Sequence, residues 1–130
     1  MEQVFHLQVD CAPTGVDGTA NATLIARVIP DFGRGMLRPA MIICPGGGYG
    51  CVCTDREGEP IARKFAAAGF HTFILEYEVN ALPYPSHLLT ACKAIAFVRE
   101  HAEEWHIDPK KVCIMGFSAG GHLAGSTGTL

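Results

Sequence analysis

Gly116-Phe117-Ser118-Ala119-Gly120-Gly121 is the stretch that decides the fold, and it directly follows Lys110–Met115, which reads as a short buried strand. The pattern Gly-x-Ser-x-Gly is typical of a nucleophile elbow, a sharp strand-to-helix turn that exposes the serine oxygen. Small neighbours let the backbone adopt such a strained turn. We therefore predict a strand over 110–115, entered from a turn at 107–109, and a helix that begins near Ser118. The alternative is that the glycines serve only close packing where a strand turns into a helix.

A second glycine-rich segment follows the apolar run Ala40–Cys44 and reads Pro45-Gly46-Gly47-Gly48-Tyr49-Gly50. Three successive glycines leave backbone N–H groups uncovered, and in a serine hydrolase such a loop donates hydrogen bonds to the oxyanion of the tetrahedral intermediate. The residue after the nucleophile, Ala119, would add its own N–H. A flexible turn and a phosphate-binding loop are the other readings. A phosphate loop would carry Gly-Lys-Ser/Thr, or Gly-x-Gly-x-x-Gly at the start of a helix, and neither pattern is present.

These motifs resemble those of the α/β-hydrolase esterases and lipases, and within them the bacterial carbohydrate-esterase-like group, similar to feruloyl and acetyl esterases. The resemblance covers nearly the whole chain. Its matching segments are Pro45–Tyr49, Glu57–Pro60, Ala66–Phe70, Ile107–Pro109 and Gly116–His122. The hormone-sensitive-lipase branch carries His-Gly-Gly-Gly, whereas Pro45 stands in the histidine position here. That difference favours the carbohydrate-ester branch.

The resemblance implies that Ser118 is the nucleophile and that the N–H groups of Gly47, Gly48 and Ala119 form the oxyanion hole. It implies a serine-type carboxylic ester hydrolase that works through an acyl-enzyme on small acetyl or aryl esters, including those of carbohydrates. Neither a cofactor nor a metal is expected. Because prolyl-oligopeptidase-like relatives use the same elbow, a peptidase stays an alternative.

The other two members of a catalytic triad are missing from the sequence. In this fold the chain order is serine, acid, histidine. No Asp or Glu follows Ser118, and the single later histidine, His122, lies four residues along the same expected helix, so we interpret His122 as structural. We expect residues 1–130 to form one incomplete α/β-hydrolase domain, the amino-terminal half through the elbow and the following helix. A catalytically incomplete fragment that acts as a binding or assembly module is the alternative.

Composition restricts the partners. The chain has 130 residues, 48% of them hydrophobic, and a formal charge of −3 from ten basic and thirteen acidic residues. It can bury a sizeable core, although a domain of this fold usually has about twice that length. The charge provides no basic surface for nucleic acid or anionic lipid, so a small neutral ester fits best. With no signal peptide and no transmembrane stretch in the sequence, we expect a cytoplasmic protein.

Six cysteines stand at positions 11, 44, 51, 53, 92 and 113, and three of them fall inside apolar strand or helix candidates. This pattern suggests reduced core thiols. Cys51 and Cys53 flank Val52 beside the glycine loop, and a metal site with Cys44 or a histidine is conceivable there. Cys-x-Cys without a second pair is a weak zinc signal, so no metal ion is expected.

Hydrophobic periodicity predicts strands over 3–9, 22–29, 40–44, 71–77 and 110–115, and helices over 60–68 and 86–105. Such alternation indicates an α/β fold with a mostly parallel sheet and helices on both faces. Both glycine motifs would then lie at the carboxyl ends of strands, where such sheets bind ligands. In the resembled fold the strand 112–115 sits mid-sheet. With the later strands missing it would be an exposed apolar edge, so we expect a homo-oligomer or association through that edge.

Overall fold

A computed structural model describes residues 2–11, 13, 18–45, 57–77 and 86–116 of the chain. In chain order its elements are β1 (Glu2–Asp10), β2 (Thr19–Arg27), β3 (Arg38–Cys44), α2 (Glu59–Ala67), β4 (His71–Tyr77), α3 (Ser86–Glu100), α4 (Ala102–Trp105) and β5 (Ile107–Gly116). Strands and helices alternate from β3 onward, as the periodicity predicts. Among the described residues, none of the helices has the length and hydropathy that a membrane-spanning helix needs.

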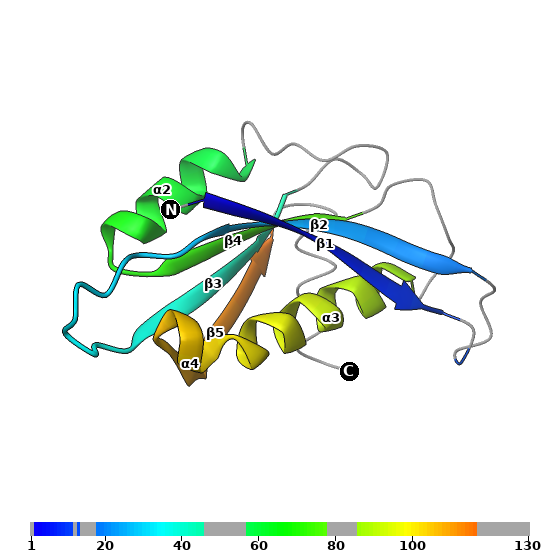
Figure 1. The fold of residues 1–130 in the computed structure, drawn as a ribbon. Helices are drawn as coiled ribbons and strands as arrows, with labels where there is room; N and C mark the ends of the chain where they lie inside the picture. The colour runs from blue at the N-terminus through cyan, green and yellow to red at the C-terminus, as the bar shows by residue number, and fades with distance from the viewer. Residues whose placement is uncertain (1, 12, 14–17, 46–56, 78–85, 117–130) are drawn as a thin grey trace.

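The five strands form one sheet in the order β1-β2-β4-β3-β5 (Figure 1). β2 runs antiparallel to both β1 and β4, whereas β3 lies parallel between β4 and β5. β1 and β2 pair along their whole length, from Glu2 opposite Arg27 to Asp10 opposite Thr19. For this reason β2 begins and ends earlier than the predicted range 22–29. The sheet is thus of the α/β type, with its parallel part at the β5 side.

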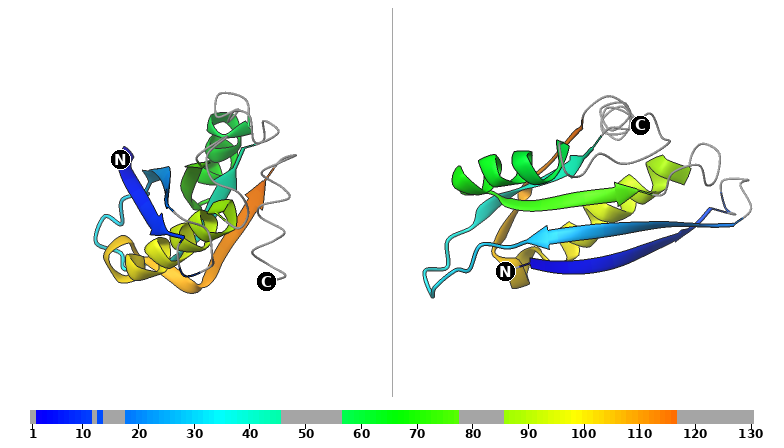
Figure 2. Two further views of the ribbon diagram at one scale, coloured as in Figure 1. Left: turned by 90° about the vertical axis from the view of Figure 1, so that its right-hand side faces the viewer. Right: turned by 90° about the horizontal axis from the view of Figure 1, so that it is seen from above.

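Helices cover both faces of this sheet, as expected, because β4 and β5 lie on opposite sides of β3 and right-handed crossovers therefore run over opposite faces. Figure 2 shows α2 on one side of the sheet and α3 with α4 on the other. Alternate residues of β3 divide between the two layers: Ala40, Ile42 and Cys44 belong to the larger core cluster with α3, and Ile43 packs with Ala62 of α2.

The long helix predicted over 86–105 ends earlier than expected. α3 ends at Glu100, the single turn of α4 follows, and His106 has a φ of 56°, in the left-handed region that terminates a helix. The ring of Trp105 stacks on that of Phe73 at a centroid distance of 5.7 Å. This packing fixes the end of α4 against the sheet, so that the chain turns directly into β5.

β5 starts earlier than predicted, and the expected turn 107–109 lies inside it. Ile107 already pairs with the first residue of β3, and regular pairing resumes at Val112 after an irregularity. Within this irregularity the Asp108 carboxylate accepts a hydrogen bond of 3.0 Å from the Lys110 N–H. The expected turn is therefore present as an irregularity in the pairing of β3 with β5. Most of β5 is half-buried or exposed, because only β3 pairs with it among the described residues.

The expectation of core thiols is only partly right. Cys11 and Cys44 are buried, but Cys92 on α3 and Cys113 on β5 are exposed, and none of these four cysteines forms a disulfide. Cys92 lies on the solvent side of its helix, and Cys113 lies on the edge strand. Apolar periodicity alone does not separate these positions from buried ones.

His71 connects three parts of the chain from a buried position. Its Nδ1 accepts a hydrogen bond of 2.9 Å from the Ile29 N–H, and its Nε2 lies 3.4 Å from the carbonyl oxygen of His106. A nitrogen that accepts a hydrogen bond carries no proton, so the ring is neutral with its N–H toward His106. Burial lowers the pKa of His71.

We predict that His71 makes the fold sensitive to acid. Because its pKa is lower in the folded chain than the ordinary value of about 6.5, its stabilising effect is complete above that value and is lost as the pH falls through the folded-state pKa. The free energy of unfolding in urea should therefore fall below about pH 6.5. This fall should be smaller in His71→Gln and unchanged in His6→Gln, whose side chain is exposed on β1. Equal acid sensitivity in all three proteins would contradict the assignment.

Candidate active site

The two glycine motifs begin at neighbouring points of the sheet. β3 ends at Cys44 and β5 ends at Gly116, and these two residues are register partners in the parallel pair. Pro45, the first residue of the glycine loop, follows β3 directly. Ligands of open α/β sheets bind at the carboxyl ends of the strands. The described residues thus bring the starts of both predicted motifs to one point on that edge.

The predicted site groups themselves lie outside the described residues, and so does the Cys-x-Cys segment. They are Gly47, Gly48, Cys51, Cys53, Ser118, Ala119 and His122. Their roles therefore stay predictions. In the part of the chain that the structure describes, no group of three or more His, Cys, Asp or Glu residues is arranged to hold a metal ion.

Tyr77 holds the first residue of the glycine loop. Its hydroxyl donates a hydrogen bond of 2.6 Å to the carbonyl oxygen of Pro45, and both residues are buried. The contact joins the carboxyl end of β4 to the carboxyl end of β3. Sequence reasoning missed it, because the pattern marks Tyr77 only as the last apolar residue of a strand. A tyrosine at the end of the strand that neighbours a glycine loop is the signal that was available.

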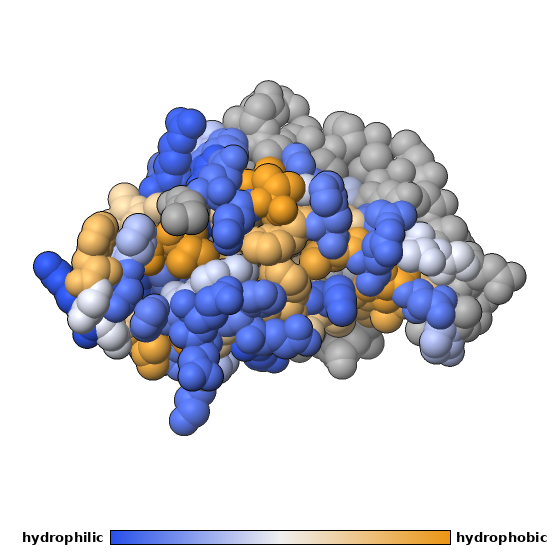
Figure 3. Space-filling view, viewed as in Figure 1, coloured by the Kyte–Doolittle hydropathy of each residue, from blue (hydrophilic) through white to orange (hydrophobic). Residues whose placement is uncertain are grey.

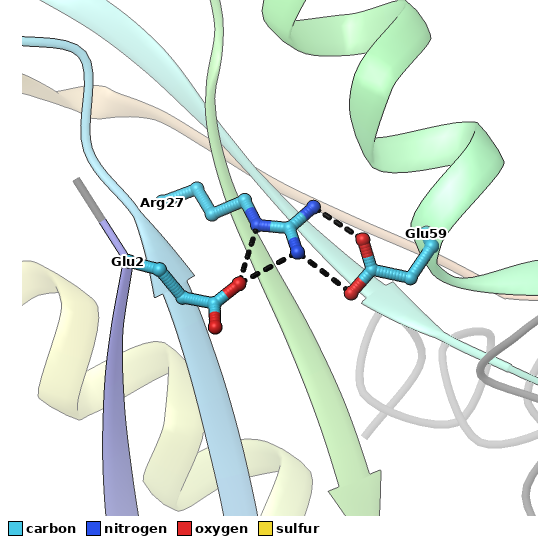
Figure 4. Close-up of polar contacts among 3 residues, drawn as sticks. All are labelled: Glu2, Arg27 and Glu59. Carbon is cyan, nitrogen blue, oxygen red and sulfur yellow. Dashed lines mark hydrogen bonds and ion pairs between the residues drawn. The ribbon is translucent and has the colours of Figure 1, made fainter.

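Arg27 holds the helix that follows the glycine loop (Figure 4). Its Nη2 donates to Glu59 Oε1 at 2.7 Å, its Nη1 contacts the other oxygen of the same carboxylate, and its Nε and Nη2 reach Glu2 at 3.0 and 2.7 Å. The hydrogen bond to Glu59 is the main cause that raises the pKa of Arg27. Glu59 is the first residue of α2, so these contacts tie that helix to β1 and β2.

Cys44 lies beside the candidate site but is not a competing nucleophile. Its side chain is fully buried, and burial raises the pKa of the thiol to about 12. The reactive form of a cysteine is the thiolate, which is negligible at neutral pH for such a group.

Among the described residues, the exposed large apolar side chains lie away from the candidate site. Phe32, Met36 and Leu37 belong to the segment that leads into the amino end of β3, and Val4 lies on β1. A hollow of about 540 Å³ between Leu37 and the residues around Ile107 lies at the same end of the sheet. Figure 3 shows apolar residues between hydrophilic ones across the middle of the face viewed there. Neither Leu37 nor this hollow adjoins the carboxyl ends of β3 and β5.

Known proteins resemble this chain in sequence and in fold. The family model described as BD-FAE matches residues 29–130. Endo-1,4-beta-xylanase B of Butyrivibrio fibrisolvens is 42% identical over 93 residues, which are 68% of this chain and 14% of that protein. Acetylxylan esterase of Xylanibacter ruminicola is 33% identical over 94 residues, which are 70% of this chain and 19% of that protein.

Solved structures of esterases and related hydrolases also resemble this chain. The structure of a sugar hydrolase, YeeB, from Lactococcus lactis matches with a TM-score of 0.78 and 30% identity, over 98% of this chain and 47% of that one. The structural neighbours are α/β-hydrolases, and the described sheet is part of that fold. The chain therefore spans less than half the length of each of these three proteins.

We predict that the Arg27 ion pairs stabilise the fold modestly. Replacing Arg27 with glutamine should lower the free energy of unfolding by about 1 kcal/mol or less, because all three side chains are partly exposed to water. Urea unfolding of Arg27→Gln beside Arg99→Gln, a matched change at an exposed position of α3, measures the effect. If both variants unfold at the same urea concentration, the ion pairs contribute nothing.

We predict that the cysteine thiols differ in their rates of alkylation. Iodoacetamide should modify Cys92 and Cys113 in the native chain at least about tenfold faster than Cys44, whose thiol is buried and un-ionised. Peptide mapping by mass spectrometry measures each rate, and the same reaction in urea serves as the control, where all of them should react. Rapid modification of Cys44 in the native chain would mean that the end of β3 is not packed as described.

Proposed function

Because this chain belongs to the BD-FAE family, a family of esterase-like hydrolases that includes carbohydrate esterases, we propose that it carries the nucleophile and the oxyanion hole of a serine-type ester hydrolase. The observation that supports this most is the pairing of Cys44 with Gly116. It brings together the starts of the glycine loop and of the elbow, which a serine hydrolase needs within a few ångströms of one another.

In the proposed reaction the Ser118 oxygen attacks the ester carbonyl while its proton passes to a histidine, and the N–H groups of Gly47, Gly48 and Ala119 stabilise the oxyanion that forms. The same histidine gives that proton to the alcohol as the ester bond breaks, and water then hydrolyses the acyl-enzyme, which releases the carboxylic acid and restores Ser118. The histidine and its orienting acid would come from a segment other than residues 1–130, because no Asp or Glu follows Ser118 in them and His122 shares its expected helix. Residues 1–130 would then be one incomplete domain.

We propose small acetyl or aryl esters of carbohydrates as the substrate class. Two relatives support it by their names, endo-1,4-beta-xylanase B and acetylxylan esterase, and the formal charge of −3 suits a neutral substrate. We also propose a cytoplasmic location, which is supported by the absence of a disulfide at Cys11, Cys44, Cys92 and Cys113.

A second candidate is an assembly module without activity of its own. The edge position of β5 favours it, since this strand pairs only with β3 among the described residues and is partly exposed. Unpaired strand edges attract further strands, so we propose that the chain associates through β5, with a second copy or with the polypeptide that completes the domain.

We predict that the chain gains activity when its site is completed. Alone, it should hydrolyse p-nitrophenyl acetate at the background rate, because loss of the triad histidine and acid lowers turnover by about four to six powers of ten. Fused to the part of YeeB that it does not cover, it should show turnover well above background, and the Ser118→Ala fusion should not.

The outcomes separate the two candidates. A fusion that folds by circular dichroism but shows no Ser118-dependent turnover would overturn the hydrolase proposal. Ser118-dependent turnover by the chain alone would instead mean that residues 1–130, or an oligomer of them, supply their own base.

A further inference from the structure

We propose that Tyr77 is a positioning residue for the oxyanion hole: its hydroxyl fixes the Pro45 carbonyl, and this orients the peptide units that lead to the N–H groups of Gly47 and Gly48. The inference rests on the proposed function, since the glycine loop has an oxyanion to bind only in a hydrolase. Tyr77 itself touches no reacting atom in this scheme and acts through the backbone.

The contact is short and buried. Tyr77 Oη lies 2.6 Å from the Pro45 oxygen, and Tyr77 is only 2% exposed. A carbonyl can only accept a hydrogen bond, so the phenol donates. Removing this donor would leave a buried carbonyl without it, and such losses cost more than a surface hydrogen bond is worth. The hydrogen bond therefore strongly favours this one orientation of the Pro45 carbonyl.

The hydroxyl is held by the scaffold and not by the loop. Tyr77 is paired in the sheet with Ala22 of β2, and its ring lies in the same core cluster as Ala22 and Cys44. A ring that is packed on rigid strands has little freedom, so its hydroxyl is a fixed reference point. Cys44, the residue before Pro45, is itself paired to β5 at Gly116. Pro45 is thus held between a paired strand residue on one side and the hydrogen bond on the other.

Fixing this particular carbonyl matters because three glycines come directly after Pro45 in the chain. A carbonyl and the next residue's N–H belong to one planar peptide unit, so holding the Pro45 oxygen restricts the whole unit that enters the glycines. The proline ring already fixes its own φ. Glycine, by contrast, has the widest conformational freedom of any residue and supplies no side chain to anchor itself. The orientation of the oxyanion donors therefore depends on the anchor in front of them.

The test compares Tyr77→Phe with Thr72→Val. The first change keeps the ring and removes the hydroxyl. The second also removes one buried hydroxyl from β4, but the Thr72 hydroxyl has no hydrogen-bond partner among the described residues. Amide hydrogen exchange of the chain, read by mass spectrometry on peptides covering 45–58, should accelerate about tenfold in Tyr77→Phe and stay unchanged in Thr72→Val. Peptides from β1 and α3 should exchange as in the wild type in both variants.

The catalytic consequence is read in the active fusion, with kcat expressed per site titrated by a fluorophosphonate. Tyr77→Phe should lower kcat about tenfold with little change in KM, because oxyanion donors act on the transition state and not on the bound substrate. A merely structural role would reduce the number of titratable sites and leave kcat per site unchanged.

Each outcome has one meaning. Unchanged exchange at 45–58 in Tyr77→Phe, or kcat per site equal to that of Thr72→Val, overturns the positioning role. Accelerated exchange together with a wild-type fusion that shows no Ser118-dependent turnover overturns the proposed function, and with it the oxyanion role, while the anchoring of Pro45 by Tyr77 stands.

Discussion

The parallel register of β3 between β4 and β5 is the constraint on which the rest of the structure depends. Ala40, Ile42, Ile43 and Cys44 are wholly buried, because helices cover both faces of the strand and hydrogen-bonded neighbours cover both edges. A slip of one residue would exchange the α2 side with the α3 side, and it would also move Cys44 away from Gly116. The same register therefore determines the core and the meeting point of the two glycine motifs.

The segment between β3 and α2 is anchored at both ends in different ways. At its start, a buried hydroxyl of the core holds the Pro45 carbonyl, and at its end a partly exposed arginine holds Glu59. The buried contact is protected from water and salt, whereas the ion pairs are screened by both. The more rigid anchor thus lies next to the glycines that are proposed to bind the oxyanion, and the softer anchor lies at the helix.

The fold was largely predictable because its signals are local. Apolar runs over 40–44 and 71–77 produce β3 and β4 within two residues of the predicted limits, and the glycine motifs identify the family. The predictions fail where contacts between residues far apart in the sequence determine the local structure. The predicted helix over 86–105 is interrupted after Glu100, and the stacking of Trp105 on Phe73 holds the end of α4 at the turn into β5. The anchoring roles of Tyr77 and Arg27 were missed because their partners, Pro45 and Glu59, each lie 32 residues away in the sequence. Hydrophobic periodicity reports only on neighbouring residues.

The arrangement of the sheet explains why the proposed site is divided into two parts, the nucleophile with the oxyanion donors and the acid with the histidine. A nucleophile after β5 and oxyanion donors after β3 need only two adjacent parallel strands, and the register of that one pair sets their relative position. In this fold the acid and the histidine follow later strands, so their position would depend on the strand that pairs with the other edge of β5. That edge has no strand partner among the described residues. In the proposed hydrolase, pairing at β5 and assembly of the triad would therefore be one event, and a change that weakens the pairing would lower activity without altering any catalytic group.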